Sequence, residues 1–210
     1  MVNSRSRLVL VALLTCAVTA VATFLLFGRS APPGDASPEA GFARDMAVHH
    51  AQAVEMSFTV RDETADSAIR GLSYDIITTQ TAQRGIFMGW LQQWGLDQAG
   101  SRPVMAWMAG HGGHGGSAAP VAAAGGAAMM PGMATPEELK RLKAAKGKDA
   151  EVLFLQLMIR HHQGGVDMAK AVLKLTTRDE VRTMAQSIVD TQNGEIGYMT
   201  ELLTARGAKP

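Results

Sequence analysis

The sequence has one cysteine, few aromatic residues and almost no net charge. Because Cys16 is the only cysteine, the chain can build neither an internal disulfide nor a metal site of several thiolates. A formal net charge of +1 gives no indication of a nucleic-acid partner. Aromatic residues make up 5% of the chain, and long alternations of β-branched residues are missing. This composition favours helices over sheets.

Proline is missing from two long stretches, residues 39–102 and 137–209. In both stretches apolar residues recur at intervals of three and four, as on one face of a helix. Thr135 begins a capping-box pattern, and Gly95 and Gly207 lie where helices should end. The predicted helices cover residues 38–60, 65–94, 149–175 and 178–206, with a short one at 136–145.

The N-terminal residues combine a basic start with a long apolar run. Residues 8–27 carry no charge, are long enough to cross a membrane, and follow Arg5 and Arg7. This pattern predicts a signal anchor or transmembrane helix over residues 1–29 and an extracytoplasmic chain after a spacer at 30–38. Two alternatives remain open: cleavage, which would give a secreted protein, and lipidation at Cys16.

Histidine is scarce but regularly placed. Four of the 6 histidines form two adjacent pairs, and at their offset of 112 positions (161 minus 49) residues 42–95 align with residues 154–207 without a gap. The matched residues include Phe42/Phe154, Val54/Val166, Thr79/Thr191, Gln80/Gln192 and Gly85/Gly197.

This self-similarity predicts an internal duplication. One helical hairpin spans residues 39–95, and a short helix plus a second hairpin spans residues 135–210. A flexible linker rich in Gly, His and Met joins them over residues 96–134. The predicted fold is an all-α four-helix bundle after an N-terminal transmembrane helix.

The histidine pairs share the inward face of their helices with methionines. At 100° per residue, each pair lies in one sector with the methionines before and after it. Thioethers favour Cu(I), imidazoles bind several d-block cations, and these faces lack the carboxylates that Mg or Ca would need. The sequence therefore predicts that imidazoles and thioethers converge on copper. The predicted ligands are Met46, His49, His50, Met56, Met158, His161, His162 and Met168.

A single buried histidine or methionine is usually an ordinary core residue. Two adjacent inward imidazoles per helix, repeated, are different, because their ring nitrogens need partners in a core with few polar groups. The linker adds a secondary set of candidate metal ligands, namely His111, His114, Met130 and Met133.

Three segments carry a resemblance to a known family: MAVHHAQAVEM at 46–56, MIRHHQGGVDM at 158–168 and MPGMATPEEL at 130–139. Over residues 40–207 the chain resembles the bacterial domain-of-unknown-function family 305. The resemblance implies a ferritin-like bundle that is exported or membrane-anchored. Some members resemble periplasmic copper-binding proteins, which implies copper or silver binding through the paired histidines and their methionines. The di-iron ferritin pattern Glu-x-x-His is absent.

We therefore expect an extracytoplasmic protein that binds copper for buffering, resistance or delivery. We expect no enzyme activity, because the sequence shows no nucleophile, no oriented base and no cofactor fingerprint. Two alternatives remain open, a helical bundle that senses pH or binds partners without metal, and a copper-dependent redox enzyme. Expected partners are a metal ion and the membrane, with no nucleic acid. Self-association or a metal-accepting protein also remains open.

Overall fold

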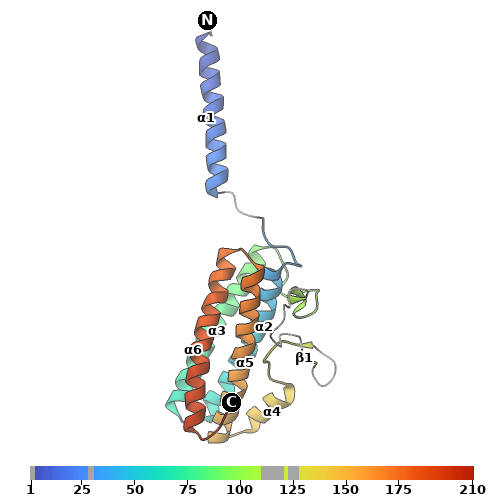
Figure 1. The fold of residues 1–210 in the computed structure, drawn as a ribbon, viewed down its shortest axis with the longest axis vertical. Helices are drawn as coiled ribbons and strands as arrows, with labels where there is room; N and C mark the ends of the chain where they lie inside the picture. The colour runs from blue at the N-terminus through green and yellow to red at the C-terminus, as the bar shows by residue number, and fades with distance from the viewer. Residues whose placement is uncertain (1–2, 28–30, 110–120, 123–127) are drawn as a thin grey trace. The chain divides into compact units, whose positions relative to one another are not determined.

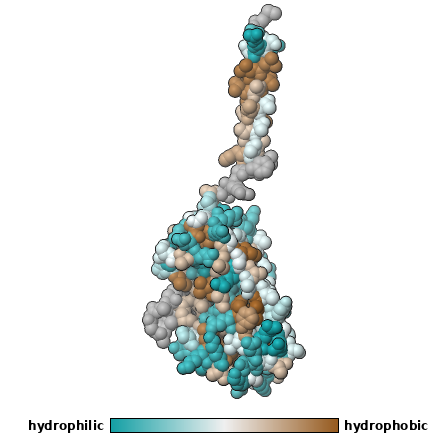
Figure 2. Space-filling model, turned by 180° about the vertical axis from the view of Figure 1, so that it is seen from behind, coloured by the Kyte–Doolittle hydropathy of each residue, from teal (hydrophilic) through white to brown (hydrophobic). Residues whose placement is uncertain are grey.

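A computed structural model describes residues 3–27, 31–109, 121–122 and 128–210. It contains two units, Met1–Pro32 and Pro33–Pro210. The first holds helix α1 (Ser4–Phe27), in which Ser4–Phe24 has a mean hydropathy of 2.1 and is long enough to cross a membrane. Apolar residues dominate its surface (Figure 2). An anchor and a signal sequence both have these properties, and α1 fits either.

The second unit, which we call the helical unit, is a bundle of four long helices (Figure 1). A short helix, one 3-10 turn and a pair of two-residue antiparallel strands lie outside the bundle. The predicted all-α fold is therefore confirmed. The elements are α2 (Pro38–Glu63), α3 (Ser67–Gln93), η1 (Ala106–Met108), β1 (Val121–Ala122), β2 (Ala128–Met129), α4 (Pro136–Ala144), α5 (Gly147–Leu175) and α6 (Asp179–Ala205).

Side chains at the helix ends explain where the helices start and stop. The Ser37 hydroxyl accepts from the Ala40 amide at the start of α2, and Pro38 occupies the first turn. Thr135 forms the predicted capping box at α4. Gly95 and Gly207 have φ of 71° and 75° after α3 and α6, a backbone conformation that glycine adopts without strain.

Helices α2 and α5 form the centre of the bundle and run antiparallel. Helix α2 packs against both α3 and α5, and α5 packs against α6. Phe42, near the start of α2, shares a hydrophobic cluster with Val172, near the end of α5. Phe154, near the start of α5, shares the other cluster with Val60, near the end of α2. We call the cluster with Phe42 the first cluster and the one with Phe154 the second cluster.

The same contact joins the two hairpins at both ends. The Thr64 hydroxyl, after α2, donates to the Glu151 carboxylate at the start of α5. The Thr176 hydroxyl, after α5, donates to the Glu39 carboxylate at the start of α2 over 2.6 Å. Both pairs are related by the 112-position offset of the sequence match. The two halves of the bundle therefore meet in an approximately two-fold manner.

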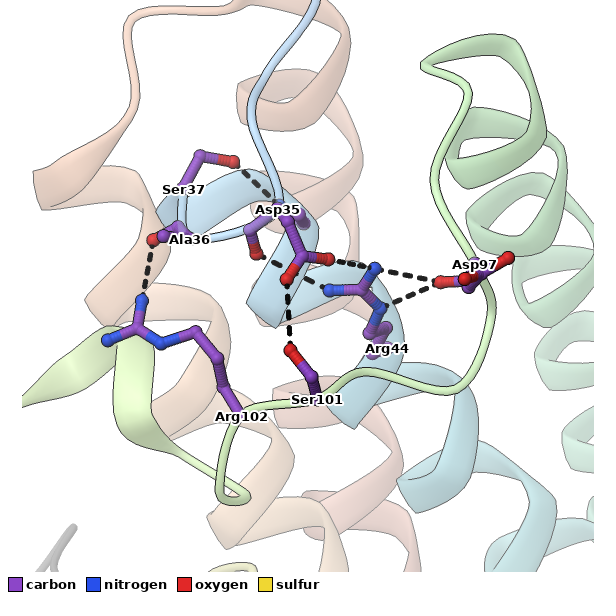
Figure 3. A network of polar contacts seen from close by, with 8 residues as sticks. Asp35, Ala36, Ser37, Arg44, Asp97, Ser101 and Arg102 are labelled. Atoms are coloured by element: carbon purple, nitrogen blue, oxygen red, sulfur yellow. Dashed lines mark hydrogen bonds and ion pairs between the residues drawn. The ribbon is translucent and has the colours of Figure 1, made fainter.

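A polar network fastens the segment before α2 to the loop after α3 (Figure 3). The buried Arg44 guanidinium donates to the Asp97 carbonyl over 2.9 and 2.8 Å and to the Asp35 carboxylate over 2.6 Å. Ser101 donates to the same carboxylate, and Arg102 donates to the Ala36 carbonyl. Arg44 therefore holds together two segments that lack regular structure.

The η1 part of the predicted linker lies against helix α2 of the bundle. At η1, the Met105 amide and the Trp107 indole N–H both donate to the Asp45 carboxylate, over 2.9 and 2.8 Å. The Trp107 ring packs edge-on against Phe42. A Cβ on Gly41 would lie only 2.5 Å from the Trp107 ring, so glycine at this position leaves room for the indole. The η1 segment therefore belongs to the first cluster. Residues 110–120 and 123–127 of the linker lie outside the described residues.

Candidate metal centre

A layer of polar side chains crosses the bundle between the two hydrophobic clusters. On each long helix, one half contributes residues to the first cluster and the other half contributes residues to the second cluster. Two residues of a shared polar layer lie between these halves. All four histidines in the layer are 0% exposed. We call this group the polar layer. Its residues are His49 and His50 on α2, Gln80 and Gln83 on α3, His161 and His162 on α5, and Gln192 and Glu195 on α6.

The two central helices meet at His49 and His161. The centroids of these two rings lie 3.7 Å apart with the ring planes tilted by 35°. His161 and His162 lie further apart, with ring centroids separated by 6.3 Å. The structure therefore brings all four predicted histidines into one layer, and the closest pair comes from different helices.

Three histidines use Nε2 for a hydrogen bond to an oxygen. His50 bonds Gln83 Oε1 over 2.8 Å, and His162 bonds Glu195 Oε2 over 2.7 Å. These two contacts are equivalent at the 112-position offset. His49 bonds the Pro131 carbonyl over 3.1 Å. Because these oxygens accept, each Nε2 carries a proton, so each ring in its neutral form keeps its lone pair on Nδ1.

Those Nδ1 atoms have no partner in the described part of the chain. Nδ1 of all four histidines and Nε2 of His161 are buried without a hydrogen bond, as are the side-chain amides of Gln80 and Gln192. Each unsatisfied buried group costs about 1–3 kcal/mol. The polar layer therefore destabilises the bundle unless something satisfies these atoms. A cation that accepts nitrogen lone pairs would do so.

Burial keeps three of the imidazoles neutral. Desolvation lowers the pKa of His49 from 6.5 to about 4. For His50, desolvation and then the nearby His49 lower the pKa to about 3. The same two causes lower the pKa of His161 well below 6.5. At neutral pH these lone pairs are free of protons, which is the state a metal requires.

The predicted methionine ligands lie on both sides of the polar layer. Met46 and Met168 are fully buried in the first cluster, and Met56 and Met158 are fully buried in the second. The ten residues from Met46 to Met56 correspond to about 15 Å of helix. The four thioethers therefore do not converge at one place in the bundle. The structure instead gives the layer one thioether pair on each side.

The secondary ligands are divided between described and undescribed residues. Met130 is buried in the first cluster, and the partly buried Met133 packs against the same cluster. His111 and His114 lie outside the described residues. In the described chain, no group of three or more His, Cys, Asp or Glu side chains is arranged to hold a metal ion. A metal in the polar layer would therefore need thioethers or a rearrangement of the rings.

Residues 130–134, which we call the strap, cross the bundle beside His49. Gln52 fastens the strap, because its amide donates to the Ala134 carbonyl over 3.0 Å and accepts from the Ala134 amide over 2.7 Å. A Cβ on Gly164 would lie 2.0 Å from the Pro131 carbonyl oxygen. Glycine at 164 therefore allows the strap to reach α5 and to offer that carbonyl to His49.

Gly165, the next residue, has a different role. A Cβ at this position would lie 2.4 Å from Gln192 Oε1. Its absence allows the Gln192 amide on α6 to approach α5 within the polar layer. Gly164 and Gly165 thus leave room for two different parts of the chain, the strap and the Gln192 side chain.

Sequence reasoning missed the half of the layer that α3 and α6 contribute. The signal was present at Gln80 and Gln192, which are identical across the repeat. Gln83 and Glu195 match in position but not in type, and only the structure shows that they contact the histidines. Neither α2 nor α5 brings a carboxylate into the polar layer, whereas α6 brings one through Glu195.

The fold and the layer define a class of protein: a four-helix bundle with paired histidines buried between two methionine-containing clusters. Residues 39–203 match the family model of DUF305, a domain of unknown function. The chain belongs to this family. No curated protein matches it.

Solved structures of relatives share the fold. A DUF305 protein from Streptomyces coelicolor is 46% identical, with a TM-score of 0.74 over 84% of this chain and 98% of the other. A DUF305 fragment from Deinococcus radiodurans is 31% identical, with a TM-score of 0.63 over 80% and 96%. CopM in its Cu(II)-bound form is 27% identical, with a TM-score of 0.58 over 80% and 97%.

Proposed function

We propose that this protein binds copper in the polar layer and holds it for buffering, resistance or delivery. The observation that carries the proposal is the set of five buried imidazole nitrogens without a hydrogen-bond partner. Such atoms cost stability in a metal-free core, and a bound cation would convert that cost into binding energy. The Cu(II)-bound relative CopM supports the choice of metal.

The donor set favours a soft or borderline cation. Imidazole nitrogens bind Cu(I), Cu(II), Zn(II) and Ni(II), whereas thioethers add a preference for Cu(I) and the similarly soft Ag(I). Met46 and Met168 on one side and Met56 and Met158 on the other are the nearest thioether clusters to the histidines along the helices. We therefore expect copper and silver to compete successfully against zinc and nickel.

The burial of the layer favours binding over turnover. Every histidine in it is fully buried, so a substrate has no open path to the donor atoms. A redox enzyme needs an open coordination position and a substrate pocket beside the metal. We propose that the protein stores or transfers copper and catalyses no reaction.

We further propose that α1 is an uncleaved anchor that places the helical unit on the extracytoplasmic side. Its length and hydropathy support a membrane span, and basic residues precede it. Mass spectrometry of the protein from membranes tests this. An intact N-terminus supports an anchor, a start near residue 30 indicates cleavage, and a lipid at Cys16 indicates a lipoprotein.

Metal analysis of a fragment of residues 31–210, which contains the helical unit, tests the copper proposal. After copper exposure and desalting, the unaltered unit should retain copper, and a variant with His49, His50, His161 and His162 changed to Ala should not. The matched control changes Gln80 and Gln192 to Ala, because it also removes unpartnered polar groups from the layer but keeps every imidazole. Circular dichroism verifies that each variant is folded. Equal copper in both variants would reject the assignment.

A further inference from the structure

The second histidine of each pair, His50 or His162, has a different partner in the two halves of the polar layer. In the first half, the His50 ring bonds the neutral amide of Gln83. In the second half, the His162 ring bonds the carboxylate of Glu195 at nearly the same distance, 2.7 Å against 2.8 Å. The two hydrogen bonds therefore have nearly the same length, but the partner is an amide in one half and a carboxylate in the other.

This difference matters because the rest of the layer carries no formal negative charge. Three of its members are glutamines and four are histidines, and neither side chain carries a negative charge. Glu195 is the one carboxylate among the eight residues of the layer, and its side chain is 17% exposed. A buried cation without a nearby negative charge is strongly disfavoured. A carboxylate that accepts from a metal-binding imidazole also makes that imidazole a better donor.

We infer that Glu195 is a positioning residue that makes the His162 half of the layer the tighter metal-binding half, with Nδ1 of His162 as the first donor atom. The inference rests on the proposed copper function and adds an order of occupation to it. Gln83 holds His50 in the same tautomer but gives no charge, so the His50 half binds a cation more weakly.

An exchange of the two partners tests the inference. Glu195→Gln keeps the length of the side chain and an oxygen acceptor but removes the charge. Gln83→Glu places the charge in the other half, and the double variant exchanges the halves. Glu201→Gln is the matched control, because Glu201 is an exposed carboxylate on the same helix. Each protein is titrated with Ag(I), a diamagnetic probe, and with Cu(II) in competition with a chelator of known affinity.

Glu195→Gln should weaken the first binding event by about 10- to 100-fold, as is typical when the outer partner of a metal-binding histidine is changed. Glu201→Gln should leave it unchanged. Heteronuclear NMR should show the first equivalent of Ag(I) shifting Nδ1 of His162 in the unaltered protein and Nδ1 of His50 in the double variant. This readout would not move if Glu195 only stabilised the fold.

The possible failures are separable. If the unaltered protein binds neither Ag(I) nor Cu(II), the proposed function is wrong. If it binds metal but Glu195→Gln has the affinity of the control, or the first Ag(I) ion shifts His50 and His162 equally, the inference alone is overturned. If Glu195→Gln does not fold, Gln83→Glu decides alone, because an unchanged affinity in the His50 half would also refute the role of the carboxylate.

Discussion

Acidification of the metal-free helical unit should begin to destabilise it above the pH at which carboxylates protonate. In the unfolded chain, imidazoles take up protons near pH 6.5. In the folded unit, His49 and His50 stay neutral down to about pH 4 and about pH 3, and the pKa of His161 is lowered in the same direction. Between these values the unfolded state binds more protons. The contribution of these histidines to the free energy of unfolding is therefore fully present above about pH 6.5 and is lost as the pH decreases through this window.

The size of the effect follows from the lowered pKa values of His49 and His50. Lowering the pKa of His49 to about 4 corresponds to about 3 kcal/mol, and lowering that of His50 to about 3 corresponds to about 5 kcal/mol. Within the window each such histidine removes about 1.4 kcal/mol per pH unit. With three of them, a domain with a stability of about 5 kcal/mol reaches its midpoint at about pH 5.3, and one of about 10 kcal/mol at about pH 4.

Urea titrations monitored by far-ultraviolet circular dichroism at a series of pH values measure this directly. His161→Leu removes one titrating group and should reduce the pH slope of the free energy of unfolding by about one third. Equal stability at about pH 7 and about pH 5 would refute the reasoning. Repeating the titrations with copper distinguishes the two hypotheses. A pH-sensing bundle without metal would unfold at the same pH with and without copper, whereas a copper-binding protein would unfold at a lower pH when copper is bound.

Three further predictions concern stability. In metal-free protein at neutral pH, His161→Leu should stabilise the fold by about 1–3 kcal/mol, because both ring nitrogens of His161 are buried without a partner. Chemical denaturation measures the change in the free energy of unfolding, and a decrease would contradict the prediction. Arg44→Ala should destabilise the fold by about 1–3 kcal/mol without changing copper content, as thermal melts and metal analysis check. Gly164→Ala should displace Pro131 and speed hydrogen exchange in the strap, whereas the control Gly71→Ala, where a Cβ meets nothing within 4 Å, should not.

The helices and the histidine-bearing faces were predictable because their signals are local. Apolar spacing, the capping box at Thr135 and the terminal glycines at 95 and 207 act within a few residues, and each is confirmed. The inward direction of His49 and His161 follows from the same periodicity, and the structure buries both rings completely.

The partners of the histidines were not predictable because they depend on distant parts of the chain. The Pro131 carbonyl reaches His49 only because Gly164 leaves room and Gln52 fastens the strap. A backbone carbonyl has no sequence signature, and a glutamine such as Gln83 has no distinctive chemistry until its helix is placed. The separation of the methionines into two clusters follows from the antiparallel packing of α2 and α5, which periodicity within one helix does not reveal.

The near two-fold meeting of the halves has one more consequence. If a single hairpin paired with an identical copy of itself, every substitution at the centre would occur on both sides at once. In one continuous chain, position 83 and position 195 are independent, and here they hold an amide and a carboxylate. Joining the halves covalently therefore makes it possible to tune one side of a symmetric interior while the other stays as it is.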